Sequence, residues 1–162
     1  MSVTILVDAD ACPVKEEVYK VAFRRGVPVR VVSNSRIRVP DHPLVERVLV
    51  SDAFDAADDW IAEECSAQSC RGHGEHGTDA RTVVITSDIV LADRCLKKGA
   101  TVIGPTGKPF TSASIGSAIA TRAIMADLRA GGDVIGGPAP FAKADRSRFL
   151  QALDAALVRL GA

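Results

Sequence analysis

The strongest constraint on the fold is the alternation, along the chain, of short apolar runs rich in β-branched residues with longer helical patterns. The strand-like runs occur at residues 4–7, 29–33, 47–50, 82–86 and 101–103. This order predicts a parallel sheet connected by crossover helices. With 162 residues, 47% of them hydrophobic, the chain can bury a sizeable core. We expect one domain over residues 1–162, a three-layer α/β/α fold with a mainly parallel five-stranded sheet.

Helices are predicted at residues 13–25, 55 to about 65, 89–98, 115–130 and 146–160. Pro13 is favoured in a first turn, and Gly26 and Gly99 supply helix ends. Residues 66–81 are polar, rich in glycine and without periodicity, so we expect a mobile surface insertion there. Zinc could in principle be held by one residue just before this segment and three within it, although their spacing matches no standard site: Cys65, Cys70, His73 and His76.

Charge and composition narrow the classes of protein. The apolar runs are too short to span a membrane, and no secretory signal is visible, so we expect a cytoplasmic protein. Twenty basic residues balance twenty acidic ones, which argues against strong nonspecific binding of nucleic acid. The four cysteines show no obvious disulfide framework, and we expect reduced thiols.

Aspartates follow two of the predicted strands. Asp8 and Asp10 come directly after the first, and Asp88 follows the fourth. These two strands are adjacent in many doubly wound sheets, and ligands bind outside the carboxyl ends of such strands. Asp55 with Asp58 or Asp59 lies at helical spacing at the start of the second helix. The alternatives are that Asp8 and Asp10 cap the helix near residue 13, and that the later aspartates form a solvated first turn.

Carboxylates that converge without histidine suit Mg²⁺ or Mn²⁺, which orient a water molecule and stabilise charge on a phosphoryl group. The chain contains no recognisable nucleophile triad, Gly-Lys-Ser phosphate loop or dinucleotide fingerprint. Cys12, near the start of the first helix, could be a reactive thiolate, but we favour a small buried side chain.

Four motifs together resemble those of the YaiI/YqxD family of bacterial proteins: DADACPV at 8–14, FDAADDWI at 54–61, TSDIVLA at 86–92 and GGPAPF at 136–141. The resemblance implies a PIN-like fold, akin to nuclease domains that hold a divalent metal with aspartates. By this likeness Asp8 and Asp88 are strand-end ligands, Asp58 is the helix acid, and Thr86 is the hydroxyl that precedes the fourth-strand aspartate. Candidates for further ligands are Asp10, Asp55, Asp59 and Asp93.

The leading hypothesis is a metal-dependent nuclease acting on RNA, in which Asp8, Asp58 and Asp88 bind the ion that activates water. Besides Thr86, the candidate substrate-binding residues are Asn34, Arg36, Arg38, Lys108 and Arg122.

Two alternatives remain open. The first Asp-Ala-Asp also resembles the opening motif of haloacid-dehalogenase phosphatases, with Asp8 as nucleophile and Thr86 and Lys97 or Lys98 in later motifs. The other alternative is a noncatalytic module that binds RNA or protein. The oligomeric state is left open.

Overall fold

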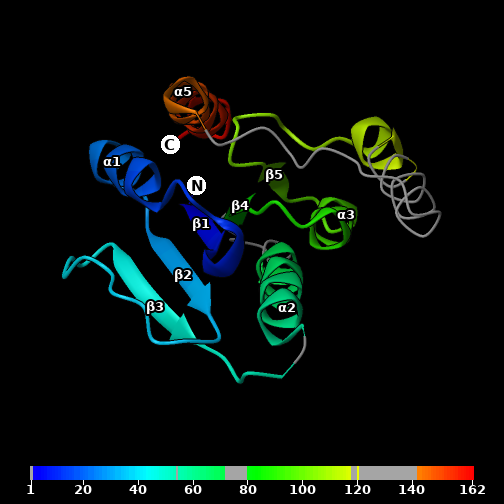
Figure 1. Ribbon diagram of the computed structural model, residues 1–162, viewed down its shortest axis with the longest axis horizontal. Helices are drawn as coiled ribbons and strands as arrows, with labels where there is room; N and C mark the ends of the chain where they lie inside the picture. Colours follow the sequence, from blue (N-terminus) through cyan, green and yellow to red (C-terminus); the bar gives the residue numbers. More distant parts are fainter. Residues whose placement is uncertain (1, 54, 72–79, 118–119, 121–141) are drawn as a thin grey trace, which may run out of the picture.

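The computed structural model describes residues 2–53, 55–71, 80–117, 120 and 142–162. Its sheet contains five strands, which are β1 (Ser2–Asp8), β2 (Val29–Ser33), β3 (Val45–Leu49), β4 (Ala80–Ile85) and β5 (Thr101–Ile103). Their order is β3-β2-β1-β4-β5, and all four pairings are parallel (Figure 1). The predicted parallel sheet is confirmed, as is the adjacency of the first and fourth strands.

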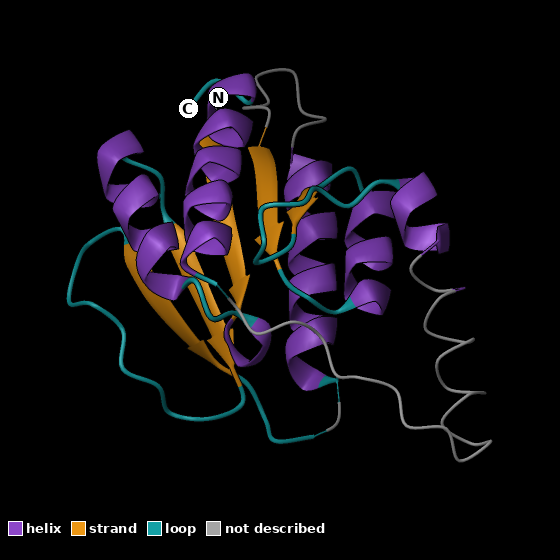
Figure 2. Ribbon diagram, turned by 45° about the horizontal axis from the view of Figure 1, so that its top comes forward, coloured by secondary structure: helices purple, strands orange, loops and turns teal. Residues whose placement is uncertain are grey.

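Helices cover both faces of the sheet. Helices α1 (Lys15–Arg25) and α5 (Lys143–Arg159) lie on one face, and α2 (Ala56–Arg71) and α3 (Ile89–Lys97) lie on the other (Figures 1 and 2). The predicted three-layer α/β/α architecture is therefore confirmed. None of the helices in the described part of the chain is long and apolar enough to cross a membrane.

The sequence of the central strand β1 is apolar without alternation because the strand is buried on both faces. Ile5 and Val7 pack in the core beneath α1 and α5, whereas Leu6 packs in the second core beneath α2 and α3. Because a parallel sheet is covered on both faces, successive side chains are buried on opposite sides. At its carboxyl end β1 leads into a short 3₁₀ helix, η1 (Ala9–Ala11), that the sequence did not indicate.

The ends of several elements differ from the predicted ones. Helix α2 continues to Arg71 and β4 begins at Ala80, so the predicted insertion at 66–81 is shorter at both ends, and its residues 72–79 lie outside the described part. Helical residues begin at 112, not 115, after Thr111 and Ser114 exchange backbone-to-side-chain hydrogen bonds of 2.8 and 3.1 Å. Residues 121–130 of that predicted helix lie outside the described part.

Candidate functional site

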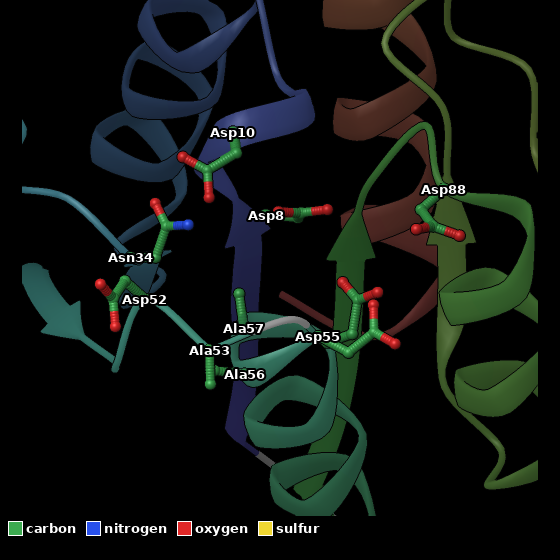
Figure 3. Close-up of a pocket in the computed structure, with 10 residues that line it drawn as sticks. Asp8, Asp10, Asn34, Asp52, Ala53, Asp55, Ala56, Ala57 and Asp88 are labelled. Atoms are coloured by element: carbon green, nitrogen blue, oxygen red, sulfur yellow. The ribbon is translucent and has the colours of Figure 1, made fainter.

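A cavity of about 330 Å³ opens at the carboxyl edge of the sheet, beside the first turn of α2 (Figure 3). Among the described residues that line it, six are aspartates and none is basic. The lining consists of Asp8, Asp10, Asn34, Asp52, Ala53, Asp55, Ala56, Ala57, Asp58 and Asp88. Because the alanines on α2 have small side chains, the space that the carboxylates face stays open.

Asp8 is the buried carboxylate at the centre of the site. Residues Val7 and Ile85 are paired across β1 and β4, so the residues that follow them, Asp8 and Thr86, lie side by side. The buried Thr86 hydroxyl donates a hydrogen bond of 2.9 Å to Asp8 Oδ2. Burial raises the pKa of Asp8, the Thr86 hydrogen bond opposes this, and the charges of Asp10 and Asp88 add to the rise.

Asp88 has a structural role besides facing the cavity. It caps α3, because its Oδ1 accepts hydrogen bonds from the backbone N–H groups of Val90 and Leu91 at 2.9 and 3.3 Å. Its own N–H donates to Thr86 Oγ1 at 3.0 Å. One threonine hydroxyl therefore holds both the Asp8 carboxylate and the backbone of Asp88. The strand-end placement predicted for Asp88 is correct, and the cap explains how its side chain is fixed.

Asp58, in the first turn of α2, is a second carboxyl group of the site whose pKa is raised. Partial burial, the charges of Asp88, Asp8 and Asp55, and a hydrogen bond with Asp88 raise the pKa of Asp58 to about 7. The hydrogen bond requires a proton between the two carboxyl groups. With a pKa of about 7, this carboxyl group is partly protonated near neutral pH.

Asp10 and Asn34 form the opposite wall of the cavity (Figure 3). Asp10 lies in η1 rather than on the strand, so it is the turn, and not the pleat, that brings it to the cavity. The buried Ser33 hydroxyl donates to Asp10 Oδ1 at 3.3 Å. The alternative that Asp8 and Asp10 cap the first long helix is wrong, because α1 has Val14 at its N-cap position and no side-chain capping bond.

The loop between β3 and α2 contributes residues that the sequence analysis missed. Asp52 and Ala53 line the cavity from this loop. Asp52 follows the third predicted strand as Asp8 and Asp88 follow theirs, so the same rule could have found it. Asp55 ends the loop with φ of 62°, a left-handed conformation that non-glycine residues adopt rarely.

Several predicted residues do not line the cavity. Asp59 forms an ion pair of 3.0 Å with Arg94, and Asp93 forms one of 2.8 Å with Lys97. The others outside the lining are exposed basic residues in loops, Arg36, Arg38 and Lys108. Arg122 lies outside the described part of the chain. The structure thus brings together Asp8, Asp10, Asn34, Asp55, Asp58 and Asp88, with Thr86 behind them.

Within the described residues, no group of three or more His, Cys, Asp or Glu side chains has the arrangement of a metal centre. Of the four residues considered for zinc, Cys65 is buried, and the side chains of Cys70, His73 and His76 lie outside the described part. Cys12 is buried, and burial raises its pKa to about 11, as expected for a packing residue rather than a thiolate nucleophile.

Comparisons with known proteins agree on one family. Residues 6–71 and 74–159 match the family described as "Uncharacterized BCR, YaiI/YqxD family". A UPF0178 protein of Sphingopyxis alaskensis is 70% identical over 157 residues, covering 96% of this chain and 94% of its own. A UPF0178 protein of Nitrobacter winogradskyi is 54% identical over 159 residues, covering 98% and 93%. No solved structure matches the chain. The chain belongs to the YaiI/YqxD family.

Proposed function

We propose that the protein is a divalent-metal-dependent nuclease that hydrolyses phosphodiester bonds in RNA. The observation that carries the proposal is the convergence of Asp8, Asp58 and Asp88 on one cavity whose described lining holds no positive charge. Carboxylates this close repel one another, as the raised pKa values of Asp8 and Asp58 indicate. A bound cation would relieve that repulsion.

The donor chemistry of the cavity fits Mg²⁺ or Mn²⁺. All the charged groups in the described lining are carboxylates, and Asn34 adds an amide oxygen. Such hard oxygen ligands suit these ions, whereas zinc prefers nitrogen and sulfur. In the described residues, no three of these carboxylates are arranged as ligands of one metal ion. Mg²⁺ does not need such an arrangement, because it commonly keeps several waters and is held through one or two carboxylates.

Each residue has a distinct part in the proposed mechanism. Asp8 and Asp88 would hold the ion, and Asp58 would join them after it gives up its proton. Thr86 fixes Asp8 through its hydrogen bond, and Asp10 faces the same space from η1. When bound, the ion would lower the pKa of a water molecule and stabilise charge on the phosphate.

The choice of RNA rests on the resemblance to PIN-like nucleases, which is an analogy at the level of the family. Exposed side chains in the loops after β2 and β5 could contact the phosphate backbone, since both loops leave the sheet at its carboxyl edge. Arg36 and Lys108 are the candidates. Neither lines the cavity, so their contribution would be to affinity and not to the chemical step.

The phosphatase alternative receives less support from the geometry. It needs a lysine near the Asp8 carboxylate, but Lys97 pairs with Asp93, and Lys98 Nζ donates to the Ala62 carbonyl of α2 at 2.8 Å. Neither lysine is part of the cavity lining.

The proposal is tested by incubating the purified protein with single-stranded RNA and Mn²⁺ or Mg²⁺. We expect cleavage that is abolished by EDTA and reduced at least about 100-fold in Asp8→Asn and Asp88→Asn, since removal of a group used in the chemical step has effects of this size. Asp59→Asn is the matched control, because Asp59 is next to Asp58 but pairs with Arg94 outside the cavity. It should keep its activity.

Two results would overturn the proposal. If the wild-type protein cleaves no RNA with either ion and calorimetry detects no ion binding, the nuclease hypothesis is wrong. If it binds RNA equally well with and without Asp8→Asn and cleaves none, the noncatalytic binding module is the correct description. Formation of a phosphorylated Asp8 with a phosphate ester substrate would instead establish the phosphatase.

A further inference from the structure

Two buried cysteines lie opposite each other between α2 and α3. Cys65 and Cys95 belong to the core that these helices form with the sheet. Cys65 lies seven residues after Asp58, and Cys95 lies seven residues after Asp88. Seven residues are about two helical turns, so a residue returns to nearly the same face of its helix. The two helices therefore bring together an acid pair at their amino ends and a thiol pair about two turns further on.

The thiol pair is in contact and is reachable from a second cavity. A hydrogen bond joins the side chains of Cys65 and Cys95. Cys65 also lines a cavity of about 180 Å³, together with Arg81 and Thr82 near the amino end of β4 and Thr101 at the start of β5. This cavity lies at the opposite edge of the sheet from the aspartates. Small oxidants could reach Cys65 without entering the acidic site.

The surroundings make the two sulfur atoms unequal. Lys98 Nζ donates to the Ala62 carbonyl, which places its positive charge one turn before Cys65 on α2. The hydrogen bond with Cys95 lowers the pKa of Cys65, burial opposes this, and the charge of Lys98 lowers it further. The same hydrogen bond and burial raise the pKa of Cys95. Because Cys65, and not Cys95, lines the cavity and has the Lys98 charge nearby, Cys65 is the one suited to attack.

We propose that Cys65 and Cys95 are a peroxide-reactive pair that closes to a disulfide linking α2 to α3. The Cys65 sulfur attacks a hydroperoxide, the O–O bond breaks, and Cys65 becomes a sulfenic acid while the other oxygen leaves as water or an alcohol. The Cys95 sulfur then attacks the Cys65 sulfur, the S–O bond breaks, and water leaves with the Cys95 proton. The two thiols lose two electrons, which the peroxide accepts.

This proposal is independent of the nuclease activity, because it needs neither a metal nor the aspartates. In proteins kept in a reducing compartment, disulfides of this kind are transient and redox-sensing rather than structural. The bond would tie together the two helices whose amino ends hold Asp58 and Asp88.

The test uses the full-length chain with Cys12→Ala and Cys70→Ala, so that only the pair remains. After treatment with hydrogen peroxide, thiol titration of the unfolded protein should fall from two thiols to none, and the intact mass should decrease by two hydrogen atoms. Dithiothreitol should reverse both changes. Adding Cys95→Ala should stop the reaction at a sulfenic acid on Cys65 that dimedone traps, whereas adding Cys65→Ala should slow the oxidation at least about tenfold.

The wild-type chain provides a second measurement in case the variants fold poorly. Proteolysis of the oxidised wild-type protein should yield a peptide in which Cys65 is linked to Cys95. A linkage of either residue to Cys12 or Cys70, a disulfide between two chains, or two thiols that survive peroxide would overturn the proposal.

Discussion

The protonation of Asp58 links the stability of the protein to pH. Its pKa of about 7 in the folded protein lies above the usual value near 4. Between these pH values the folded state binds more protons than the unfolded state, so the free energy of unfolding decreases as pH rises through this window and levels off above it. A neutral side chain at position 58 removes this dependence.

We therefore expect Asp58→Asn to raise the free energy of unfolding at pH 8 by about 1–2 kcal/mol, allowing for solvent screening, and to change it little at pH 4. Urea denaturation at both pH values measures the difference. Asp59→Asn is the control and should stay within about 0.5 kcal/mol at either pH. Equal effects of the two substitutions at pH 8 would mean that the neighbouring carboxylates do not destabilise the charged form of Asp58.

Thr86 serves two partners with one buried hydroxyl, since it donates to Asp8 and accepts from the Asp88 N–H. Thr86→Val keeps the shape but leaves both groups without that partner, so we expect a loss of about 1–3 kcal/mol in urea denaturation at pH 7. Thr86→Ser keeps the hydroxyl and should lose clearly less. If the two variants were equally destabilised, packing and not hydrogen bonding would explain the role of Thr86.

Among the elements, the turn after β5 and helix α5 are in unusually close contact. Gly107 has φ of 87°, and a Cβ placed there would lie 2.7 Å from the Arg148 carbonyl oxygen of α5. Gly99, after α3, has a similar φ of 85° but open space around it. The two positions share the conformational requirement and differ only in the contact.

We expect Gly99→Ala to destabilise the protein by about 1 kcal/mol through backbone strain, and Gly107→Ala to destabilise it by about 2–4 kcal/mol because α5 must also shift. Thermal and urea denaturation compare the two. Similar losses at both positions would show that α5 is not held tightly against this turn.

For the whole molecule, ion binding should be visible as stabilisation. A cation that binds only the folded protein stabilises it by about 2.7 kcal/mol at a concentration 100 times its Kd. We expect Mn²⁺ to raise the Tm of the wild-type protein but not that of Asp8→Asn. Because the proposed ion would displace the proton of Asp58, its affinity should be higher at pH 8 than at pH 6. Calorimetry at the two pH values checks this, and an affinity independent of pH would contradict it.

Much of the fold could be predicted because it depends on local sequence. The boundaries of β2 and β5 agree with their apolar runs, and α1 and α3 end at Arg25 and Lys97, shortly before Gly26 and Gly99. Helix starts were less predictable. Two helical segments, the one from residue 112 and helix α5, begin upstream of their first apolar positions. Capping hydrogen bonds set these starts, such as the bond that the Ala142 N–H donates to the Asp145 carboxylate. That the 162 residues form a single PIN-like domain stays a prediction.

The residues of the candidate site also fall into two groups, those that local sequence predicts and those that only the packing of the helices decides. Asp8 and Asp88 follow apolar strands, and parallel strands share one carboxyl edge, so the local pattern was enough to bring them together. The choice between Asp58 and Asp59 was not local. Neighbouring helical residues point about 100° apart, and only the packing of α2 against α3 turns Asp58 to the cavity and Asp59 to Arg94. The same packing sets Cys65 against Cys95, because contacts between segments distant in sequence depend on how whole helices are rotated.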